Sequence, residues 1–447
     1  MQYHLKATSP LNRSTLAEWL SYLENSHFKA IDLGLERVKS VAEKLELLTP
    51  APFVITVGGT NGKGTTCRLL ETILLNAGYR VGVYSSPHLL RYNERVRIQN
   101  QELPDEQHIA SFSFIEANKI HSLTYFEFST LSALHLFKQA NLDVVLLEVG
   151  LGGRLDATNI VDSQLAVITG IDIDHVDFLG DTREKIAFEK AGIFRENCSA
   201  VIGDPDIPKT MIEQAKSLNC HLSCRDKDWQ FILNNSSWIW QNTKVRYENL
   251  PFCHIPLANA ATALAVIQFL PFEISEQVIR QSLIEVELIG RFQTIKQEKL
   301  IQLVDRIGKN IKECPRIIID VGHNPQAARY LAEKLTELKA ECQGNINAVC
   351  GILKDKDSEG ILSPLLPIID HWYCATLGGY RGQSGSELSK SLQQYAITQS
   401  FNILVEEADS VTEAVKSAVK NTDKKDILLI FGSFYTVGEF LSLIEGK

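Results

Sequence analysis

A glycine-rich turn between an apolar run and a helical pattern constrains the fold most strongly. Residues 53–57, FVITV, are apolar and rich in β-branched side chains, which predicts a short buried strand. The turn GGTNGKGTT follows at 58–66, and residues 65–78 have helical apolar spacing that ends at a glycine. A strand, a glycine turn and a helix in succession are typical of phosphate-binding loops, because the helix N-terminus presents free N–H groups and a positive dipole end.

The turn departs from the common P-loop pattern at two positions. That pattern, G-x-x-x-x-G-K-[ST], requires a glycine at 57 and a hydroxyl residue at 64, where this chain has Val57 and Gly64. The missing hydroxyl is the group that binds Mg²⁺ in common P-loops. Lys63 still supplies a positive charge. We therefore expect a phosphate-binding loop whose metal ion is held by residues elsewhere in the chain.

Three polar residues at strand ends are candidates for that metal site. Ser85 ends the strand pattern 81–85, Glu148 ends the apolar run DVVLLEVG, and His175 follows LAVITGIDIDH. Ligands in α/β sheets bind beyond the carboxyl ends of the strands, so three such residues after three strands predict a metal site. One acid at a strand end is often only structural, and that alternative stays open for each residue.

The remaining pattern predicts an α/β protein with two domains. Strand-like runs at 81–85, 144–149, 165–169 and 200–203 alternate with helical patterns, which indicates a mostly parallel sheet. The first 50 residues are helical in pattern, with Ser14 as an expected N-cap, and 229–245 predicts hairpins at the sheet edge. A second α/β series begins near Arg316, so we predict a first domain at 1–292, a linker at 293–315 and a smaller domain at 316–447.

Composition excludes several other classes of protein. The 447 residues carry a net charge of -9, which argues against a general nucleic-acid binder. A local basic cluster at 91–97 suits either an anionic small molecule or a solvated edge strand. Neither a signal peptide nor an apolar run of membrane-spanning length is expected. The nine scattered cysteines favour a reducing cytoplasm over disulfides or a zinc site.

Ten motifs in a fixed order resemble one enzyme family. After the glycine turn come SSPHLLRYNERVRI, TYFEFSTLSAL, LLEVGLGGRLDATN, IDHVDFLGDTREKIAFEKAGIF, NAATALA, GRFQ, DVGHNPQAA, GILKDKD and FGSFYTVG. They resemble the bacterial dihydrofolate synthase/folylpolyglutamate synthase family of Mur-type amide ligases, over nearly the whole chain from about Ile31 to Gly438.

The resemblance implies a P-loop ATPase-like domain and a Rossmann-like domain, with the active site in the cleft between them. It also implies addition of L-glutamate to dihydropteroate and to the γ-carboxylate of tetrahydrofolate, through an acyl phosphate. ATP and two Mg²⁺ ions would be required, and use of a monovalent cation such as K⁺ stays open. The partners would be these small molecules, with no nucleic acid or membrane, and the enzyme would be a cytoplasmic monomer.

The resemblance assigns roles to individual residues. It implies Lys63, Glu148, His175 and Lys190 in catalysis, and Ser85, Glu148, His175 and carbamylated Lys190 as metal ligands. For ATP it implies Gly59, Thr60, Asn61, Gly62, Lys63, Gly64, Thr65, Asn259, Arg291 and Asp320. For the pterin it implies Ala30, Ile31, Asp32, Thr124, Tyr125, Phe126, Glu127, Leu155, Asp156 and Ala157, and for glutamate His323 and Ser433.

Plainer interpretations remain for several of these residues. Asn259 heads an apolar helix and would serve as an N-cap, and Lys190 alone is typical of a solvated helix lysine. His323 would fit an ordinary strand–helix turn, while Phe126 and Phe128 would fit a core. The chain departs from the family pattern with Gly322 in place of alanine, Gln326 in place of a second histidine, and a long 293–315 stretch.

Parts of the sequence also fit other functions. A GTPase would explain DFLG at 177–180, but the chain lacks the Asn-Lys-x-Asp guanine motif. A cell-wall amino-acid ligase would carry a further domain before the loop, where only about 50 residues stand. Folylpolyglutamate synthase activity alone, or a non-catalytic nucleotide-binding module, are the remaining alternatives.

Overall fold

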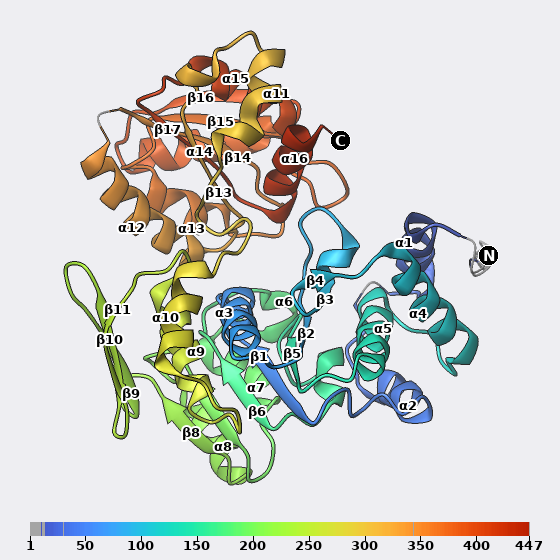
Figure 1. The fold of residues 1–447 in the computed structure, drawn as a ribbon. Coiled ribbons are helices and arrows are strands. Elements are labelled where there is room, and N and C mark those ends of the chain that lie inside the picture. The colour runs from blue at the N-terminus through green and yellow to red at the C-terminus, as the bar shows by residue number, and fades with distance from the viewer. Residues whose placement is uncertain (1–9, 11–13, 30, 343, 447) are drawn as a thin grey trace. The chain divides into compact units, whose positions relative to one another are not determined.

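The computed structural model describes residues 10, 14–29, 31–342 and 344–446, and it divides into two compact units, Met1–Glu287 and Leu288–Lys447 (Figure 1). Each unit is built around its own largely parallel sheet with helices on its faces. The predicted two-domain α/β fold class is therefore confirmed.

The first unit contains an eight-stranded sheet in the order β4-β3-β2-β5-β1-β6-β7-β8. Its antiparallel pairs are β2–β3 and β3–β4, and the other neighbouring strands pair in parallel. The strands are β1 (Phe53–Gly58), β2 (Val81–Tyr84), β3 (Val96–Ile98), β4 (Gln101–Glu102), β5 (Val144–Glu148), β6 (Leu165–Ile168), β7 (Ser199–Ile202) and β8 (His221–Cys224). The four strands predicted between 81 and 203 all form.

Helices cover both faces of this sheet, which is why its central strands are largely apolar, with Thr56 in β1 and Glu148 at the end of β5 as polar exceptions. In β5, Val144 and Leu146 enter one core while Val145 and Leu147 enter another. The first core lies under α3 (Lys63–Asn76), α9 (Leu257–Ile267) and α10 (Glu276–Glu285). The second core lies under α1 (Leu16–Asn25), α2 (Glu36–Lys44), α4 (Asp105–Asn118) and α5 (Tyr125–Gln139). In a third core, α7 (Arg183–Ala191) and α8 (Lys209–Ser217) pack on β6 and β7.

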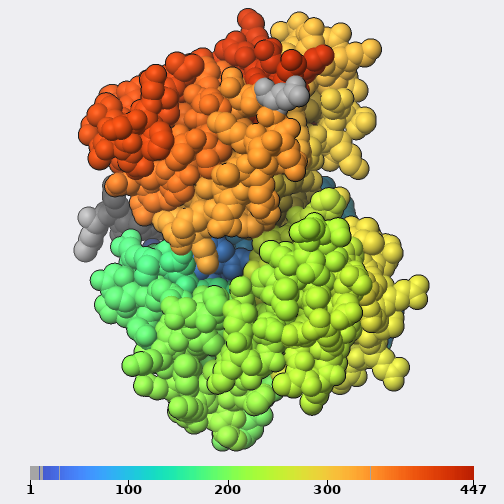
Figure 2. Space-filling view, turned by 90° about the vertical axis from the view of Figure 1, so that its left-hand side faces the viewer, coloured from blue at the N-terminus to red at the C-terminus, as the bar shows by residue number. Residues whose placement is uncertain are grey.

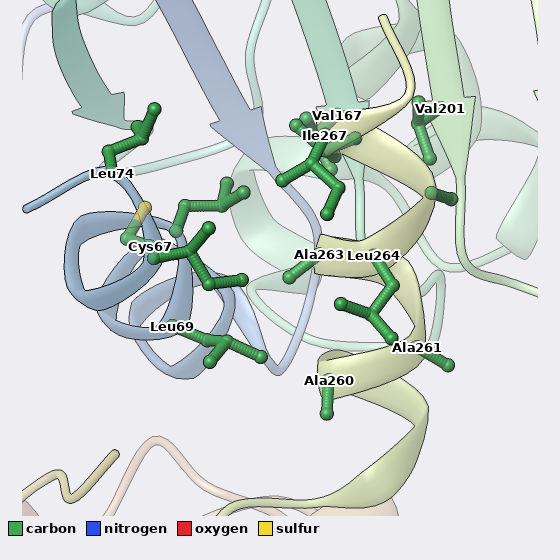
Figure 3. Packing of buried hydrophobic residues seen from close by; sticks show 14 of the residues in the cluster. Cys67, Leu69, Leu74, Val167, Val201, Ala260, Ala261, Ala263, Leu264 and Ile267 are labelled. Carbon is green, nitrogen blue, oxygen red and sulfur yellow. The ribbon is translucent and has the colours of Figure 1, made fainter. Parts of the chain in front are cut away.

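Small side chains bring α9 close to α3. Ala260, Ala263 and Leu264 of α9 face Cys67 and Leu69 of α3, and all five side chains are buried (Figure 3). Alanine leaves little side chain between the two backbones, so the N-terminus of α9 can reach the start of α3. This packing places the glycine turn beside α9.

The β-rich segment predicted at 229–245 forms a separate sheet rather than hairpins on the edge of the main one. Strands β9 (Trp229–Leu233), β10 (Trp238–Asn242) and β11 (Arg246–Leu250) pair antiparallel. Trp240 Nε1 donates to Ala261 O at 3.0 Å and fastens this sheet to α9. The segment forms part of the yellow-green surface in Figure 2.

Helix α1 begins one residue later than predicted. Its N-cap is Thr15 rather than Ser14, because the Thr15 hydroxyl accepts from Glu18 N while the Glu18 carboxylate accepts from Thr15 N. This reciprocal pair is a capping box, which requires a glutamate or glutamine three residues after the cap, and Glu18 stands at that distance from Thr15.

The second unit has a six-stranded sheet in the order β12-β13-β17-β14-β15-β16, in which only β12 is antiparallel. Its strands are β12 (Gln293–Thr294), β13 (Arg316–Asp320), β14 (Ile346–Cys350), β15 (His371–Ala375), β16 (Leu404–Ala408) and β17 (Ile427–Phe431). Its main helices are α12 (Pro325–Glu341), α14 (Gly385–Thr398), α15 (Val411–Asn421) and α16 (Phe434–Glu445).

The stretch 293–315 also contains short elements: η3 (Gln297–Leu300), α11 (Ile301–Arg306) and η4 (Ile311–Glu313). Across the described part of the chain, every helix is too short or too polar to cross a membrane.

Candidate active site

The glycine turn adopts a conformation that only glycine fits. Gly59 has φ 143° and Gly62 has φ 90°, both in the region that L side chains avoid. A Cβ on Gly59 would collide with Thr169 Oγ1, and a Cβ on Gly62 would collide with the Asn259 amide. The turn therefore has its backbone in close contact with two other segments.

The backbone of the turn is hydrogen-bonded to Thr169 and Gly170, which follow β6. Thr60 N donates to Gly170 O at 2.7 Å, and Thr169 Oγ1 donates to Asn61 O at 2.6 Å. Lys63 Nζ folds back over the turn and lies 3.0 Å from Gly59 O and 3.2 Å from Thr60 O. A preformed loop with a lysine over it, at the N-terminus of α3, fits a phosphate group.

Asn259 reaches the same loop from a distant part of the sequence. It is the third residue of α9, whose N-cap is Pro256, so the structure does not use it as an N-cap. Its Nδ2 donates to Thr65 Oγ1 at 2.8 Å. The two predicted nucleotide-binding segments are therefore adjacent.

Ser85 and Glu148 lie at the carboxyl edge of the sheet beside the loop. Strands β2 and β5 are neighbours, with Tyr84 paired to Leu147, and Glu148 is paired to Val57 at the end of β1. Ser86 N donates to Glu148 Oε2 at 3.4 Å, and residue Glu148 is 5% exposed. A buried carboxylate and a hydroxyl beside a phosphate loop are hard oxygen donors of the kind Mg²⁺ prefers.

Lys190 is buried rather than solvated, with 3% of its surface exposed in α7. Burial lowers its pKa to about 7, helped by the positive charge of Lys63 and opposed by Asp174. The influence of Lys63 on this pKa means that the two amino groups lie near enough for their charges to interact.

His175 lies at the N-terminus of the short helix α6 (Val176–Leu179) with φ 52°. Its side chain is 40% exposed, and its Nε2 is 4.0 Å from Asp174 Oδ2. Among the described residues, no three His, Cys, Asp or Glu side chains form a metal-binding group by themselves. The predicted metal set includes only two such residues, Glu148 and His175, with oxygen donors from Ser85 and a modified Lys190 completing it.

A buried ion pair supports Ser85, and the sequence analysis did not identify it. Arg97 Nη1 donates to Ser85 Oγ at 3.2 Å, and Arg97 Nη2 lies 2.9 Å from Glu71 Oε2. Glu71 is a fully buried residue of α3 and also accepts from Arg68. The basic cluster at 91–97 was a signal for Arg97, but no local signal identifies Glu71.

The predicted pterin segments at 30–32 and 124–127 are joined by Arg37, which sequence reasoning also missed. Arg37 Nη1 lies 2.7 Å from Asp32 Oδ2, and its Nη2 donates to Glu127 Oε1 at 2.8 Å. Thr124 caps α5 and forms a capping box with Glu127. Ile31 is exposed, while Ala30 lies outside the described residues.

The third pterin segment, at 155–157, lies near the second. The Phe126 ring packs against Gly150, where an added Cβ would lie 2.6 Å from Cζ. Asp156 is buried and accepts from Leu151 N at 2.8 Å and Thr158 N at 3.0 Å, while burial raises the pKa of its carboxyl. Of the two phenylalanines with a core alternative, Phe128 is a core residue and Phe126 is half-buried.

The predicted residues of the second unit gather around Phe434. The Arg291 guanidinium lies 5.5 Å from the centre of the Phe434 ring, and the His323 ring lies 5.9 Å from it. Ser433 is the N-cap of α16 and accepts from Thr436 N at 3.0 Å. His323 therefore belongs to a cluster with Ser433 and Arg291 within this unit.

Asp320 ends β13 in the same region and explains the glycine at 322. Its carboxylate accepts from Phe292 N at 2.8 Å and from Gly322 N at 2.6 Å. Burial raises the pKa of this carboxyl, while Arg291 opposes the shift. A Cβ on Gly322 would lie 2.8 Å from Asp320 Oδ1, so glycine leaves room for this hydrogen bond.

Comparison with known proteins places the chain in a family. The Mur ligase middle domain matches residues 57–267, and the Mur ligase glutamate ligase domain matches 290–434. A dihydrofolate synthase/folylpolyglutamate synthase of Haemophilus influenzae is 68% identical over 441 residues, which is 99% of both chains. The chain belongs to the dihydrofolate synthase/folylpolyglutamate synthase family of Mur ligases.

Solved structures of this family share the whole fold. Escherichia coli FolC in complex with DHPP and ADP aligns with a TM-score of 0.90 at 48% identity, covering 98% of this chain and 99% of the other. A bifunctional folylpolyglutamate synthase/dihydrofolate synthase with Mn, AMPPNP and L-glutamate bound aligns with a TM-score of 0.87 at 49% identity, covering 98% and 100%. The family expected from the ten motifs is confirmed.

Proposed function

We propose that this chain is an ATP-dependent ligase that joins L-glutamate to dihydropteroate and to the γ-carboxylate of tetrahydrofolate. The observation that carries the proposal is the glycine loop with Lys63 over it, beside the buried residue Glu148. That arrangement stands in a chain 68% identical to a relative named for these two synthase activities.

The chemistry requires ATP because a carboxylate does not form an amide with an amine at neutral pH. A carboxylate oxygen of the acceptor attacks the γ-phosphorus, the bond to ADP breaks, and an acyl phosphate forms. The glutamate amine then attacks the acyl carbon, phosphate leaves with the bonding electrons, and the amine loses a proton. Such phosphoryl transfer depends on positioning and on neutralising charge. Lys63 and the loop N–H groups would supply that neutralisation.

Two Mg²⁺ ions would neutralise the remaining phosphate charge when bound. Ser85 and Glu148 would hold one, since both lie at the same sheet edge as the loop. Glu148, His175 and carbamylated Lys190 would hold the other. A relative solved with Mn, AMPPNP and L-glutamate bound supports the use of a divalent ion.

The buried environment of Lys190 supports its carbamylation. A pKa of about 7 leaves a large neutral fraction near pH 7. The neutral amine can attack CO₂, and loss of one proton leaves a carbamate with oxygen donors. Carbon-13 NMR of protein equilibrated with labelled bicarbonate should show one carbamate signal. That signal should be absent in Lys190→Met.

The other roles are proposed by position. The loop with Asn259 would bind the ATP phosphates, and Arg291 with Asp320 would contact the nucleotide. The three segments at 30–32, 124–127 and 155–157 would hold the pterin, where Arg37 links the first two and Phe126 lies near the third. His323 and Ser433 would hold glutamate. All nine cysteines are free thiols, which supports a cytoplasmic location.

The test is mass spectrometry of two reactions that contain enzyme, ATP, Mg²⁺ and L-glutamate. One receives dihydropteroate and the other tetrahydrofolate. A gain of one glutamate in both reactions is expected, and Lys63→Met should abolish both. A gain with only one acceptor would restrict the function to that activity. No gain in either would contradict the proposal.

A further inference from the structure

Arg95 is a nearly buried cation with no acidic partner in the described part of the chain. Its exposure is 9%, and it forms no ion pair with any described residue. Its guanidinium makes a single hydrogen bond to another described side chain, from Nε to His88 Nδ1 at 2.8 Å. Its two Nη groups form no hydrogen bond with a described residue and are not fully enclosed.

The groups around Arg95 leave its charge uncompensated. The guanidinium lies 5.9 Å from the centre of the Tyr92 ring and 5.5 Å from that of Tyr125, and such contacts attract a cation only weakly. His88 stays neutral above about pH 4, because burial and Arg95 itself lower its pKa to about 4, while Glu94 opposes the shift. A buried charge without a counterion is costly, so such a group commonly has an anionic ligand.

Arg97, two residues later, shows what the same side chain does when its role is structural. It lies against the fully buried carboxylate of Glu71, which accepts from its Nε and Nη2. The two arginines therefore differ in their partners: Arg97 has an internal carboxylate, whereas Arg95 has only a neutral imidazole and two aromatic rings.

Arg95 lies between two parts of the proposed site. Its carbonyl oxygen accepts from Ser85 N at 2.9 Å, beside the proposed metal ligand. Its guanidinium lies beside Tyr125, which starts the proposed pterin segment of α5. An acceptor bound by its pterin at one end must present its carboxylate toward the phosphate loop. A carboxylate bound to Arg95 would therefore lie between the proposed pterin segment and the phosphate loop.

We propose that Arg95 binds the carboxylate at the reacting end of the acceptor through its two Nη groups. This inference rests on the proposed function and names a substrate-binding residue for it. An arginine fork matches the two oxygens of a carboxylate, so it fixes the orientation of the group as well as its position. Arg95 would hold one carboxylate oxygen toward the γ-phosphorus, which favours the attack by positioning.

Isothermal titration calorimetry with two ligands tests this contact. The ligands are dihydropteroate and the matching analogue that lacks the carboxylate, each titrated into protein holding AMPPNP and Mg²⁺. Wild type should bind dihydropteroate about 10- to 100-fold more tightly than the analogue, as expected for a hydrogen bond between charged groups. Arg95→Met should lose that preference while binding the analogue as wild type does.

Arg91→Met is the matched control, because Arg91 is in the same segment, is 60% exposed and pairs with Glu102. It should keep the wild-type preference. Arg95→Lys keeps the charge without the fork and should show an intermediate preference; it decides the question if Arg95→Met does not fold. The proposed contact would be contradicted if the folded Arg95 variants bound both ligands equally more weakly than wild type. It would also be contradicted if they kept the wild-type preference for dihydropteroate. If wild type binds neither ligand and adds no glutamate, the proposed function fails instead.

Discussion

Asn259 Nδ2 donates a hydrogen bond of 2.8 Å to Thr65 Oγ1, across 194 residues of sequence. This contact joins the N-terminal turn of α9 to the first turn of α3, and it places the Asn259 amide directly against Gly62. The loop is therefore shaped by α9 as well as by the strand and helix that flank it.

Asn259→Ala should weaken nucleotide binding. The substitution removes the bond to Thr65 and leaves space beside Gly62, so the loop loses one support. A lost hydrogen bond of this kind corresponds to about 1 kcal/mol, or a several-fold rise in the dissociation constant of AMPPNP. Titration calorimetry measures it. Gln268→Ala, at the other end of α9, is the control and should leave AMPPNP affinity unchanged.

Gly62→Ala should be far more damaging than Gly78→Ala. Both glycines have φ 90°, so both substitutions carry backbone strain of roughly 1–3 kcal/mol. Only at Gly62 does the new Cβ collide with another residue, whereas at Gly78 nothing lies within 4 Å. Thermal melting should show a larger loss for Gly62→Ala, together with loss of AMPPNP binding. Equal effects of both variants would show that the Asn259 contact is unimportant.

Glu71→Gln should destabilise the protein and weaken metal binding. The change leaves Arg97 without its buried counterion, which costs roughly 3 kcal/mol, and frees the Arg97 side chain that positions Ser85. Mn²⁺ affinity in the presence of AMPPNP, followed by electron paramagnetic resonance, should fall as well. Glu102→Gln removes an exposed pair with Arg91 and should cost well under about 1 kcal/mol.

His108 should make stability depend on pH in the acidic range. Burial lowers its pKa to about 4, and neither ring nitrogen has a hydrogen-bond partner among the described residues. The unfolded chain, with a histidine pKa of about 6.5, takes up the proton first as the pH falls. Because of His108, the free energy of unfolding should therefore fall by up to roughly 3 kcal/mol as the pH is lowered from about 6.5 to 4.

Thermal melts at several pH values test this prediction. His108→Leu should lose less stability than wild type between neutral pH and pH 5, because an apolar side chain suits the contacts with Tyr92 and Phe112. The exposed His121→Gln should follow the wild-type profile. If the stability of His108→Leu falls with pH in parallel with wild type, another group is responsible for the loss of stability at acidic pH.

Residues fixed by local pattern were predictable from the sequence. Glu148 ends an apolar run and Lys63 opens a helix after a glycine turn, so the order of strand, turn and helix alone places both at the carboxyl edge of the sheet. Thr15 was missed as the cap of α1 because Ser14 is an equally capable residue, and the Glu18 partner decides between them.

Supporting residues were not predictable, because their partners are brought together only by the fold. Arg37 reaches Glu127 across 90 residues, and Arg97 reaches Glu71 from a neighbouring element. The cluster at 91–97 draws attention to Arg97, but no local pattern shows which carboxylate either arginine pairs with. The separate sheet of β9–β11 was also not predictable, since strand patterning does not reveal which sheet a strand joins.

The most direct test of the account follows the oxygen atoms of the acceptor. Dihydropteroate whose carboxylate is labelled with the heavy oxygen isotope would be converted with ATP, Mg²⁺ and L-glutamate, and the released phosphate analysed by mass spectrometry. An acyl phosphate requires that each phosphate released carry one labelled oxygen atom. Glutamate addition that leaves all of the label in the pterin product or water, with none in phosphate, would contradict activation of the carboxylate by ATP.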